Sequence, residues 1–425
     1  MIDIRAARED PDRTRAALAR RDRAYPPLLD RALAADERRR TLLKDVEQRK
    51  AERNRRSEDI ARCKKAGTDA TDLLADLKDL STRIKHLDDE LKQVDGTLID
   101  LLLQLPNLPL AEVPDGDTAA NVVVRSWGTP PAFGFEPRPH WELGERLGIL
   151  DLAAGAKIAG SGFPVLRGAG ARLTRALAGL MVELHTREHG YIEIQPPLLV
   201  NADTARGTGQ LPDKEGTMYV TTDGLYLIPT AEVPVTNLHR DDVIAADRLP
   251  LAYTACTPCF RREAGAHGKD TRGLLRVHQF DKVELVRIVK PEESPAELER
   301  LLGHAEAVLT RLELPYRVVR LATGDLGFAA AMTYDLEVWA AGVGQWLEVS
   351  SASTFTDFQA RRANIRYRST PDAKPDFVHT LNASGVAFAR TIVALLENNQ
   401  EADGTVRIPA ALAPFLGTER LGPGA

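Results

Sequence analysis

Residues 258–286 read PCFRREAGAHGKDTRGLLRVHQFDKVELV, two strand-like flanks joined by a loop that contains several glycines. Side chains two apart in a strand share a face, so Arg261 and Glu263 share one on the first flank. On the second flank the residues that share a face are His278, Phe280, Lys282 and Glu284. If the flanks pair as a hairpin, one surface offers a guanidinium, an aromatic ring and carboxylates.

This combination of side chains suits a nucleotide together with an amino acid. A guanidinium can bind a phosphate through two hydrogen bonds, Phe280 offers a stacking surface for a base, and a carboxylate can accept hydrogen bonds from an ammonium. The loop between the flanks carries His267, Lys269 and Arg272 among Gly265, Gly268 and Gly273. The simpler alternative is a surface hairpin with charged outer residues and Phe280 in the core.

Two further segments favour the binding interpretation. WLEVSS at 346–351 ends an apolar strand with a carboxylate and hydroxyls, which are the hard oxygen ligands that Mg²⁺ takes alongside phosphates. SGVAFAR at 384–390 is expected to open a helix whose first turn brings Arg390 inward. Each segment alone is also compatible with a solvated glutamate or a surface arginine.

The N-terminal part of the chain predicts a long helical arm. Apolar residues recur in steps of four and three at Leu73, Leu77, Leu80, Ile84, Leu87, Leu91, Val94, Leu98, Leu101 and Leu105. This spacing is the heptad seam of a coiled coil, and it ends at Pro106. Residues 28–65 are also helical in composition, and Gly67-Thr68-Asp69 separates the two helices. So short a break favours an antiparallel hairpin, about 60 Å long for roughly 40 residues per helix.

The two helices of this arm differ in charge. Residues 38–65 hold twelve Lys and Arg against five Asp and Glu, whereas residues 72–95 hold four against seven. The first helix is therefore basic, and its apolar seam is interrupted by Lys50, Arg53 and Ser57. The charges either bind an anionic partner or simply solvate an exposed helix, and a coiled coil between two chains is a further alternative.

The remainder of the chain predicts an α+β domain. Residues 106–170 are rich in proline and glycine and are expected to be a linker. A helix follows with Leu173, Leu177, Leu180 and Leu184 on one face, then short strand signals recur with helices at 295–312 and 384–399. Strands in close succession favour a mostly antiparallel sheet flanked by helices.

Composition excludes several classes of protein. The 425 residues carry 56 Lys and Arg against 61 Asp and Glu, so an anionic partner must be met by local patches. There is no run of 18 apolar residues, and the first residues do not resemble a signal peptide, so we expect a cytoplasmic protein that does not enter a membrane. Three cysteines fit a reducing compartment.

The cysteines do not predict a metal site. Cys256 and Cys259 with His267 and His278 have gaps of seven and ten residues, whereas a zinc finger needs a histidine pair three to five apart. We therefore expect no zinc. The glycine-rich phosphate loops GxGxxG and GxxxxGK[ST] are also absent from the sequence, so neither a Rossmann nor a P-loop site is predicted.

The chain resembles the bacterial seryl-tRNA synthetases, a family of class II aminoacyl-tRNA synthetases. The resemblance runs from the arm at 28–105 through Ile408. Motifs 1, 2 and 3 of class II are matched by GYIEIQPP, FRREAGAHGKDTRGLLRVHQFDKVE and SGVAFARTIVALLENNQ. Segments similar to the seryl branch are GTGQLP at 207–212, PTAEVP at 229–234, EVSS at 348–351 and HTLNASG at 379–385. The resemblance implies a tRNA-binding domain at 1–105 and a class II catalytic domain at 106–425.

The resemblance implies that the chain activates serine with MgATP and transfers the seryl group to serine tRNA, and to selenocysteine tRNA as well. It implies a catalytic set of Arg261, Glu348 and Arg390. The serine-binding set would be Thr230, Ala231, Glu232, Arg261, Glu284 and Ser384. The ATP-binding set would be Arg261, Arg262, Glu263, Val277, Phe280, Glu348, Val349, Ser350, Ser351 and Arg390, with Mg²⁺ on Glu348 and Ser351.

Individual roles follow from the same resemblance. Arg261 would hold the ATP α-phosphate and the serine carboxylate, Glu263 the adenine amine, Phe280 the adenine face and Arg390 the γ-phosphate. Thr230 and Glu232 would surround the serine ammonium, while Glu284 and Ser384 would lie near its hydroxyl. The arm would reach the long variable arm of serine tRNA, and motif 1 would build a homodimer.

Two alternatives remain open in the sequence. A related serine-activating ligase could serve a carrier protein or a biosynthetic pathway, but such a protein resembles the catalytic core without the arm. A catalytically inactive RNA-binding regulator should have lost Arg261, Glu348 or Arg390, and all three are present.

Overall fold

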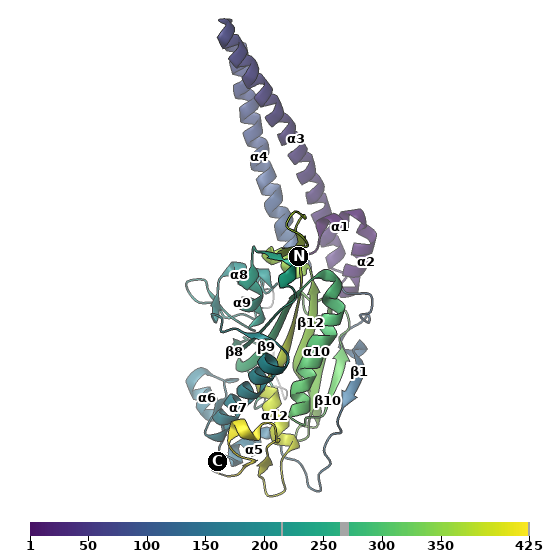
Figure 1. The fold of residues 1–425 in the computed structure, drawn as a ribbon, viewed down its shortest axis with the longest axis vertical. Coiled ribbons are helices and arrows are strands. Elements are labelled where there is room, and N and C mark those ends of the chain that lie inside the picture. The colour runs from purple at the N-terminus through teal and green to yellow at the C-terminus, as the bar shows by residue number, and fades with distance from the viewer. Residues whose placement is uncertain (214–215, 264–271, 424–425) are drawn as a thin grey trace. The chain divides into compact units, whose positions relative to one another are not determined.

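The computed structural model describes residues 1–213, 216–263 and 272–423, and the chain forms two compact units, Met1–Pro106 and Asn107–Ala425 (Figure 1). The loop residues Gly265, His267, Gly268 and Lys269 lie outside the described residues. No helix in the described ranges is both long enough and apolar enough to cross a membrane.

The first unit is helical. Its helices are α1 (Ile4–Glu9), α2 (Pro11–Arg21), α3 (Tyr25–Ala66) and α4 (Thr71–Gln104). The prediction of two long helices joined by a short break is confirmed, because α3 ends at Gly67, whose φ of 71° is the left-handed conformation that glycine adopts readily. Helices α1 and α2 pack at the base of α3, where Arg8 pairs with the buried Asp36 at 2.8 Å.

The heptad seam of α4 is buried or half-buried along its length, and α3 meets it with Leu42, Val46 and Ile60. Between Val46 and Ile60, however, α3 buries no side chain. In this stretch, basic residues of α3 pair with acidic residues of α4: Lys50 with Asp88 and Arg56 with Asp76, each at 3.0 Å. A further pair, Arg39 with Asp95 at 2.6 Å, precedes it on α3.

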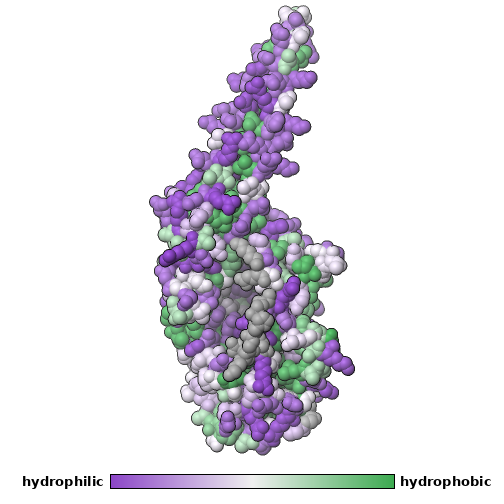
Figure 2. Space-filling model, turned by 180° about the vertical axis from the view of Figure 1, so that it is seen from behind, coloured by the Kyte–Doolittle hydropathy of each residue, from purple (hydrophilic) through white to green (hydrophobic). Residues whose placement is uncertain are grey.

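Exposed ion pairs of this kind contribute little stability, at most about 1 kcal/mol each. The opposite charges of α3 and α4 therefore select the pairing of the two helices more than they hold it together. The surface of the arm is accordingly covered mainly by hydrophilic side chains, with small hydrophobic areas between them (Figure 2).

The second unit is built on a sheet that, among the described residues, has eight strands. In spatial order they are β1 (Val122–Trp127), β10 (Tyr316–Arg320), β11 (Met332–Ala340), β12 (Gln345–Thr356), β15 (His379–Ala387), β9 (Gln279–Val289), β8 (Leu251–Phe260) and β4 (Ile192–Glu193). All neighbours are antiparallel except β4 and β8. The predicted α+β class with a mostly antiparallel sheet is confirmed.

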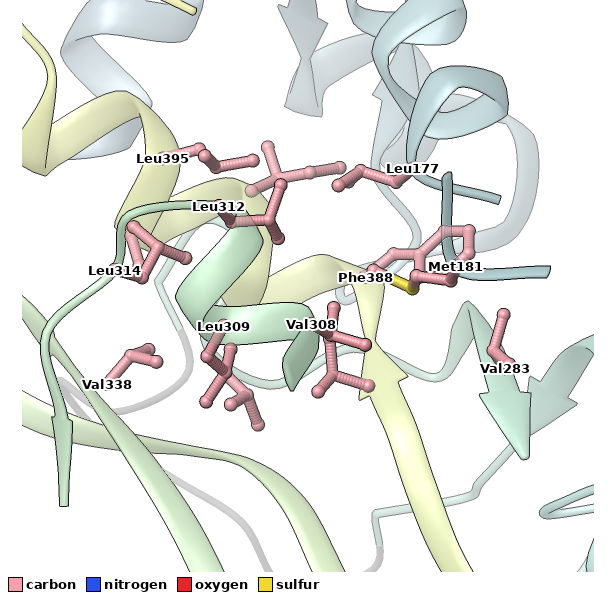
Figure 3. Close-up of a cluster of buried hydrophobic side chains, with 14 of the residues drawn as sticks. Leu177, Met181, Val283, Val308, Leu309, Leu312, Leu314, Val338, Phe388 and Leu395 are labelled. Atoms are coloured by element: carbon pink, nitrogen blue, oxygen red, sulfur yellow. The ribbon is translucent and has the colours of Figure 1, made fainter. Parts of the chain in front are cut away.

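Three helices cover one face of this sheet and form the core with it. They are α7 (Ala169–Glu183), α10 (Ser294–Arg311) and α12 (Phe388–Asn398). Side chains from the helices meet those of the strands in one apolar cluster (Figure 3). On β9 the residues Val283 and Leu285 point into this core, so Lys282 and Glu284 point to the opposite face.

The remaining elements are short. The helices are α5 (His140–Arg146), α6 (Leu152–Ala159), α8 (Ala202–Gly207), α9 (Glu232–Thr236), α11 (Phe358–Ala363) and α13 (Ala413–Leu416), with 3₁₀ turns at Thr118–Ala120, Asn237–His239, Ala246–Arg248 and Pro291–Glu293 and a π turn at Leu184–Glu188. The small strands are β2 (Leu150–Asp151), β3 (Val165–Leu166), β5 (Leu199–Val200), β6 (Tyr226–Leu227), β7 (Val243–Ala245), β13 (Arg366–Arg368), β14 (Asp376–Phe377), β16 (Val406–Arg407) and β17 (Arg420–Leu421).

Three local expectations need correction. The segment 106–170 was expected to be a linker, but it contributes β1 to the edge of the sheet and folds into α5 and α6. Ser384 lies in β15, and α12 begins only at Phe388, although Arg390 does fall in its first turn. Strand β8 ends at Phe260, so Arg261 and Glu263 follow the strand and do not share one of its faces.

Candidate functional site

The face of the sheet opposite the helices brings together most of the predicted polar residues. We call it the site face, and it carries Phe280, Lys282, Glu284, Ser351, Asn382 and Asp335. The strand register fixes this arrangement, because Glu284 lies opposite Ser384 on β15 and Ser351 lies opposite Asp335 on β11. The face count on the second flank of the hairpin, with Phe280, Lys282 and Glu284 together, is confirmed.

Two buried carboxylates, Glu232 and Glu284, form the centre of the site face. Asn382 bridges them, because its Nδ2 atom donates to Glu232 Oε2 at 2.9 Å and to Glu284 Oε1 at 2.8 Å. Thr230 donates its hydroxyl to Glu284 at 3.0 Å. The pair therefore lies in a fixed geometry with two neutral donors.

Glu232 comes from α9 and is held from a second side. Gln359 on α11 donates to Glu232 Oε1 at 2.5 Å, and Thr380 orients Gln359 by donating to its carbonyl oxygen at 2.7 Å. Burial, followed by the nearby charge of Glu284, raises the pKa of Glu232 to about 7. A cation that entered this pocket would favour the ionised form of Glu232.

The charge of Glu284 is met by Lys282, whose Nζ lies 2.5 Å from Glu284 Oε2. Both side chains are almost fully buried, which makes this ion pair sensitive to the loss of either partner. The pocket thus contains two carboxylates and one ammonium. It can accept one further cationic group, such as the ammonium of an amino acid.

Arg261 and Phe280 lie side by side at the end of the hairpin. The Arg261 guanidinium carbon is 5.3 Å from the centre of the Phe280 ring, and the Arg261 Nε donates to the Pro229 carbonyl at 3.4 Å. Backbone pairing continues past the strand, since the Arg261 amide donates to the His278 carbonyl at 2.8 Å. The guanidinium is therefore positioned between the carboxylate pocket and an aromatic surface.

Glu263 is positioned by an ion pair rather than by a strand. Its φ of 44° is in the left-handed region, and its carboxylate accepts from Arg276 at 2.8 Å. Arg262 is exposed and its backbone amide donates to the Thr217 carbonyl at 2.9 Å. Arg272 stacks over Trp141 at 4.4 Å.

The other end of the site face holds Arg390, Glu348 and Ser351. Arg390 donates to the backbone carbonyls of Glu348 and Leu275, each at 2.9 Å, and its Nη1 is 3.4 Å from the Glu348 carboxylate. These bonds fix the guanidinium at the edge of strand β12. Its remaining donors can meet an anion.

Several predicted nucleotide residues have buried side chains. Val349 belongs to the core cluster, and the Ser350 hydroxyl donates to the Ser384 carbonyl at 2.5 Å. Both could therefore reach a ligand only through backbone atoms. The side chain of Val277 is also buried. Among the predicted serine-binding residues, Ser384 is buried opposite Glu284, and Ala231 is fully buried between Thr230 and Glu232.

The residues around Glu348 and Ser351 fit a magnesium ion. Ser351 interacts with the Asp335 carboxylate, and burial followed by the charge of Glu348 raises the pKa of Asp335 well above its usual value. In the described ranges no three or more His, Cys, Asp or Glu side chains converge on one point. A cation here would rely on the Glu348 carboxylate, the Ser351 hydroxyl and oxygens from its ligand, which is how proteins usually hold Mg²⁺ with phosphates.

A pocket of about 410 Å³ lies beside this site. Val277 and Phe280 line it, but its other walls come from α6, β3, α7 and α12 and are mainly apolar. Arg261, Glu284 and Glu348 do not line it. The pocket therefore does not coincide with the polar groups that can bind an amino acid and phosphates.

Sequence reasoning missed five residues of the site: Asn382, Gln359, Thr380, Arg276 and Asp335. Asn382 and Thr380 lie within a segment that was singled out, HTLNASG, but their partners come from distant elements. Arg276 alternates with His278 and Phe280, which was a usable signal for the site side of the hairpin. No local sequence pattern indicates that Gln359 contacts Glu232.

Comparison with known proteins gives matches over both units. A family model described as the seryl-tRNA synthetase N-terminal domain matches residues 1–109. A second family model, described as the tRNA synthetase class II core domain (G, H, P, S and T), matches residues 219–399.

Curated relatives match the chain over almost its full length. The chain is 54% identical over 420 residues to a serine–tRNA ligase of Gemmatimonas aurantiaca. The aligned residues cover 98% of this chain and 99% of that protein. It is 53% identical to the serine–tRNA ligase of Carboxydothermus hydrogenoformans, with 99% of each chain covered. The crystal structure of seryl-tRNA synthetase from Pyrococcus horikoshii complexed with ATP superimposes with a TM-score of 0.95 at 38% identity, and the match covers 100% of both chains.

Proposed function

Because the chain belongs to the seryl-tRNA synthetase family, we propose that the site face is where it activates serine. The chain is a ligase that joins serine to tRNA, with ATP as its substrate for activation. The observation that carries the assignment of residues is the buried carboxylate pair Glu232 and Glu284, bridged by Asn382 and adjoining Arg261. We propose that this pocket receives serine.

In the pocket, Glu232 and Thr230 bind the serine ammonium, and Ala231 forms the wall between them. Glu284 and Ser384 lie at the hydroxyl end. A site built to hydrogen-bond a hydroxyl rejects analogues that lack it by about 10⁴ to 10⁵ in favourable cases, because its buried polar groups would lose their partners. Threonine must instead be excluded by size.

The nucleotide lies along the end of the hairpin. Phe280 stacks on the adenine, Glu263 accepts from its amine, and Arg261 contacts both the α-phosphate and the serine carboxylate. The ion pair from Arg276 orients Glu263 for this role. Arg262, Val277, Val349 and Ser350 flank the nucleotide, and Arg390 binds the γ-phosphate.

The first step is an in-line displacement. The serine carboxylate oxygen attacks the α-phosphorus, a P–O bond forms, the bond to the bridging oxygen breaks, and pyrophosphate leaves with its electron pair. Arg261 neutralises the α-phosphate and Arg390 the leaving group, so the protein contributes alignment and charge without a covalent intermediate. A Mg²⁺ held by Glu348 and Ser351 would supply further positive charge to the phosphates.

In the second step the terminal ribose hydroxyl of serine tRNA takes the seryl group, and AMP leaves. The hydroxyl oxygen attacks the seryl carbonyl carbon, and the bond from that carbon to the phosphate oxygen of AMP breaks. The departing phosphate can accept the hydroxyl proton, so we assign no side chain as the base. We propose selenocysteine tRNA as a second acceptor.

The tRNA-binding role belongs to unit 1. The basic helix α3 keeps exposed cations that form no ion pair within the described part of the chain: Lys44, Arg55, Lys64 and Lys65. Such groups can meet the phosphates of the variable arm of serine tRNA. The presence of this arm also argues against a ligase that serves a carrier protein.

We further propose a homodimer formed through motif 1. Strand β4 is the edge of the sheet and leaves Ile192 58% exposed, with Leu198 and Leu199 also exposed beside it. An uncovered edge with apolar side chains favours pairing with a second copy about a two-fold axis. The three cysteines are free, which fits a reducing compartment, so we propose a cytoplasmic location for the enzyme.

Serine-dependent exchange of pyrophosphate into ATP tests the proposal. We expect exchange with serine and little with threonine, alanine or glycine, followed by charging of purified serine tRNA. Equal exchange with threonine would contradict the pocket assignment. Serine exchange without charging of any tRNA would instead favour the carrier-protein ligase.

A further inference from the structure

Asp335 lies on the site face but has no part in the proposed chemistry. It sits on β11 directly opposite Ser351 on β12, so its side chain is adjacent to one of the two residues assigned to Mg²⁺. The next residue on the same face of β11, Glu337, lies opposite Glu348, the other assigned ligand. The strand register thus brings Asp335 to the phosphate end of the site.

The surroundings of Asp335 supply it with too few partners. Its Oδ1 atom is buried and has no hydrogen-bond partner, although the residue as a whole is only half-buried. Ser351 interacts with the carboxylate, while the other strong neighbours, Glu348, Asp325 and Glu337, are acidic. A buried carboxylate oxygen without a partner is costly to the folded protein.

Glu337 provides a comparison on the same strand face. Its carboxylate pairs with Arg317 at 2.5 Å, and that arginine also stacks over Trp346 at 5.0 Å. Glu337 therefore has a cationic partner within the sheet, namely Arg317. Asp335 forms no ion pair with any described residue, so its buried oxygen is open to a cation that the described chain does not supply.

We propose that Asp335 is a third oxygen donor, with Glu348 and Ser351, for the divalent cation that accompanies ATP. Mg²⁺ prefers six oxygen ligands and usually takes carboxylates from the protein and the remainder from phosphates and water. Two carboxylates also balance its charge, and the cation removes the repulsion between them. The inference rests on the proposed function, because the nucleotide supplies the remaining oxygens.

The test is the Mn²⁺ affinity of the full-length protein bound to a non-hydrolysable ATP analogue, measured as free Mn²⁺ by electron paramagnetic resonance. Asp335→Asn keeps the shape of the side chain but removes the charge. We expect it to weaken Mn²⁺ binding by about 10- to 100-fold, as loss of metal-site groups does elsewhere. Affinity for the analogue without metal should stay the same.

Glu337→Gln is the matched control, because it removes the same charge from the same face two residues away. It should leave Mn²⁺ affinity unchanged. Thermal melting without metal checks the fold, and Asp335→Asn should melt at or above the native temperature since a neutral amide is cheaper to bury. Asp335→Ser, which is smaller, serves as a second variant if the amide does not fit.

The proposal predicts that Asp335→Asn and Glu348→Gln both lose Mn²⁺ affinity. If Glu348→Gln loses it and both Asp335 variants keep it, Asp335 is not a ligand, although the assignment of Glu348 survives. If all these variants bind Mn²⁺ as the native chain does, the cation lies elsewhere and the inference fails together with the assigned magnesium site. Serine-dependent pyrophosphate exchange, measured in parallel, shows whether the wider proposed function stands.

Discussion

At the residue scale, the carboxylates Glu232 and Glu284 are distinguished by their partners. Glu284 faces an ammonium, Lys282, and so keeps a neutralised charge. The Glu232 carboxylate accepts hydrogen bonds from the amides of Asn382 and Gln359, and burial leaves its charge costly. An amine that binds in the pocket therefore gains most from Glu232, whereas a hydroxyl can bond to Glu284 without changing the charge of the site.

This difference predicts the effect of pH on serine use. The pKa of Glu232 is raised to about 7 in the free enzyme, so the ionised form that binds an ammonium is lost as the pH falls below that value. We expect kcat/KM for serine in pyrophosphate exchange to decline about tenfold per pH unit below pH 7. Glu232→Gln should be poorly active at every pH and lack that decline, and a native profile flat down to pH 5 would contradict the assignment.

Glu284 should act on serine alone. Glu284→Gln removes the charge but keeps the shape, and we expect a loss of roughly 2 to 4 kcal/mol in kcat/KM for serine with ATP affinity almost unchanged. Glu284→Ala is a poorer variant, because it leaves the buried Lys282 without any acceptor at that position, whereas glutamine keeps one oxygen. Glu263→Gln is the matched comparison and should weaken ATP instead. An equal loss for both substrates in Glu284→Gln would mean that its role is misassigned.

Asn382 should matter as much as the carboxylates that it joins. Asn382→Leu removes both hydrogen bonds and leaves two like charges without a common donor. We expect the KM for serine to rise at least tenfold and the decline of kcat/KM with acid to move to higher pH. Thr333→Val, on the same sheet face, loses a hydroxyl contact to Ser353 at 2.9 Å and serves as a packing control. Unchanged serine kinetics in Asn382→Leu would refute the bridging role.

At the element scale, α7 continues as a π turn that places His185 and His189 beside His304 of α10. His185 Nδ1 lies 3.0 Å from His189 Nδ1, the rings of His189 and His304 stack at 3.9 Å, and Tyr191 lies 3.0 Å from His304. Burial, then the charge of His189, lowers the pKa of His185 to about 4, and the same causes lower that of His304 to about 3. At neutral pH, His185 and His304 are therefore uncharged in the folded protein.

This cluster predicts loss of stability in acid. Between about pH 6.5, the pKa of an unfolded histidine, and pH 4 the unfolded chain binds protons that the native state does not. The free energy of unfolding should thus fall as the pH falls through this window, by about 1.4 kcal/mol per pH unit from His185 alone. Urea unfolding from pH 7.5 to 4.5 measures it. His304→Phe should give a shallower slope, and an identical slope would argue against the cluster.

The sequence predicted elements better than the contacts between them. The heptads of α4 and the period of two in β9 are local, so the arm and the face of Phe280 and Glu284 could be found. Strand β1 was missed because its six residues lie among prolines and glycines and only β10 shows why they are extended. Gln359 reaches Glu232 from α11, 127 residues away, and no local pattern encodes such a contact. Glu263 was misjudged because β8 ends at Phe260.

At the scale of the whole molecule, the tRNA binding and the serine activation that we propose belong to different units of the chain. The polar groups of the site all lie in Asn107–Ala425, and the basic excess lies in Met1–Pro106. Replacing residues 45–90 with a short Gly/Ser turn shortens the arm while keeping its base, where Arg8 pairs with Asp36. We expect pyrophosphate exchange within a few-fold of native and charging of serine tRNA to fall steeply. Full charging by this variant would reduce the arm to a structural appendage.

The two classes of basic residue on α3 sharpen that experiment. Lys44, Arg55, Lys64 and Lys65 form no ion pair within the described residues, whereas Lys50 and Arg56 are already paired with acids of α4. Each phosphate contact that is lost should lower the log–log slope of tRNA affinity against salt by about 0.7 to 0.9. Replacing the four unpaired residues with glutamine should therefore flatten the slope, while Lys50→Gln with Arg56→Gln should change it little. If both sets of variants gave the native slope, these residues of α3 would not contact phosphates. Their charges would then only solvate the helix.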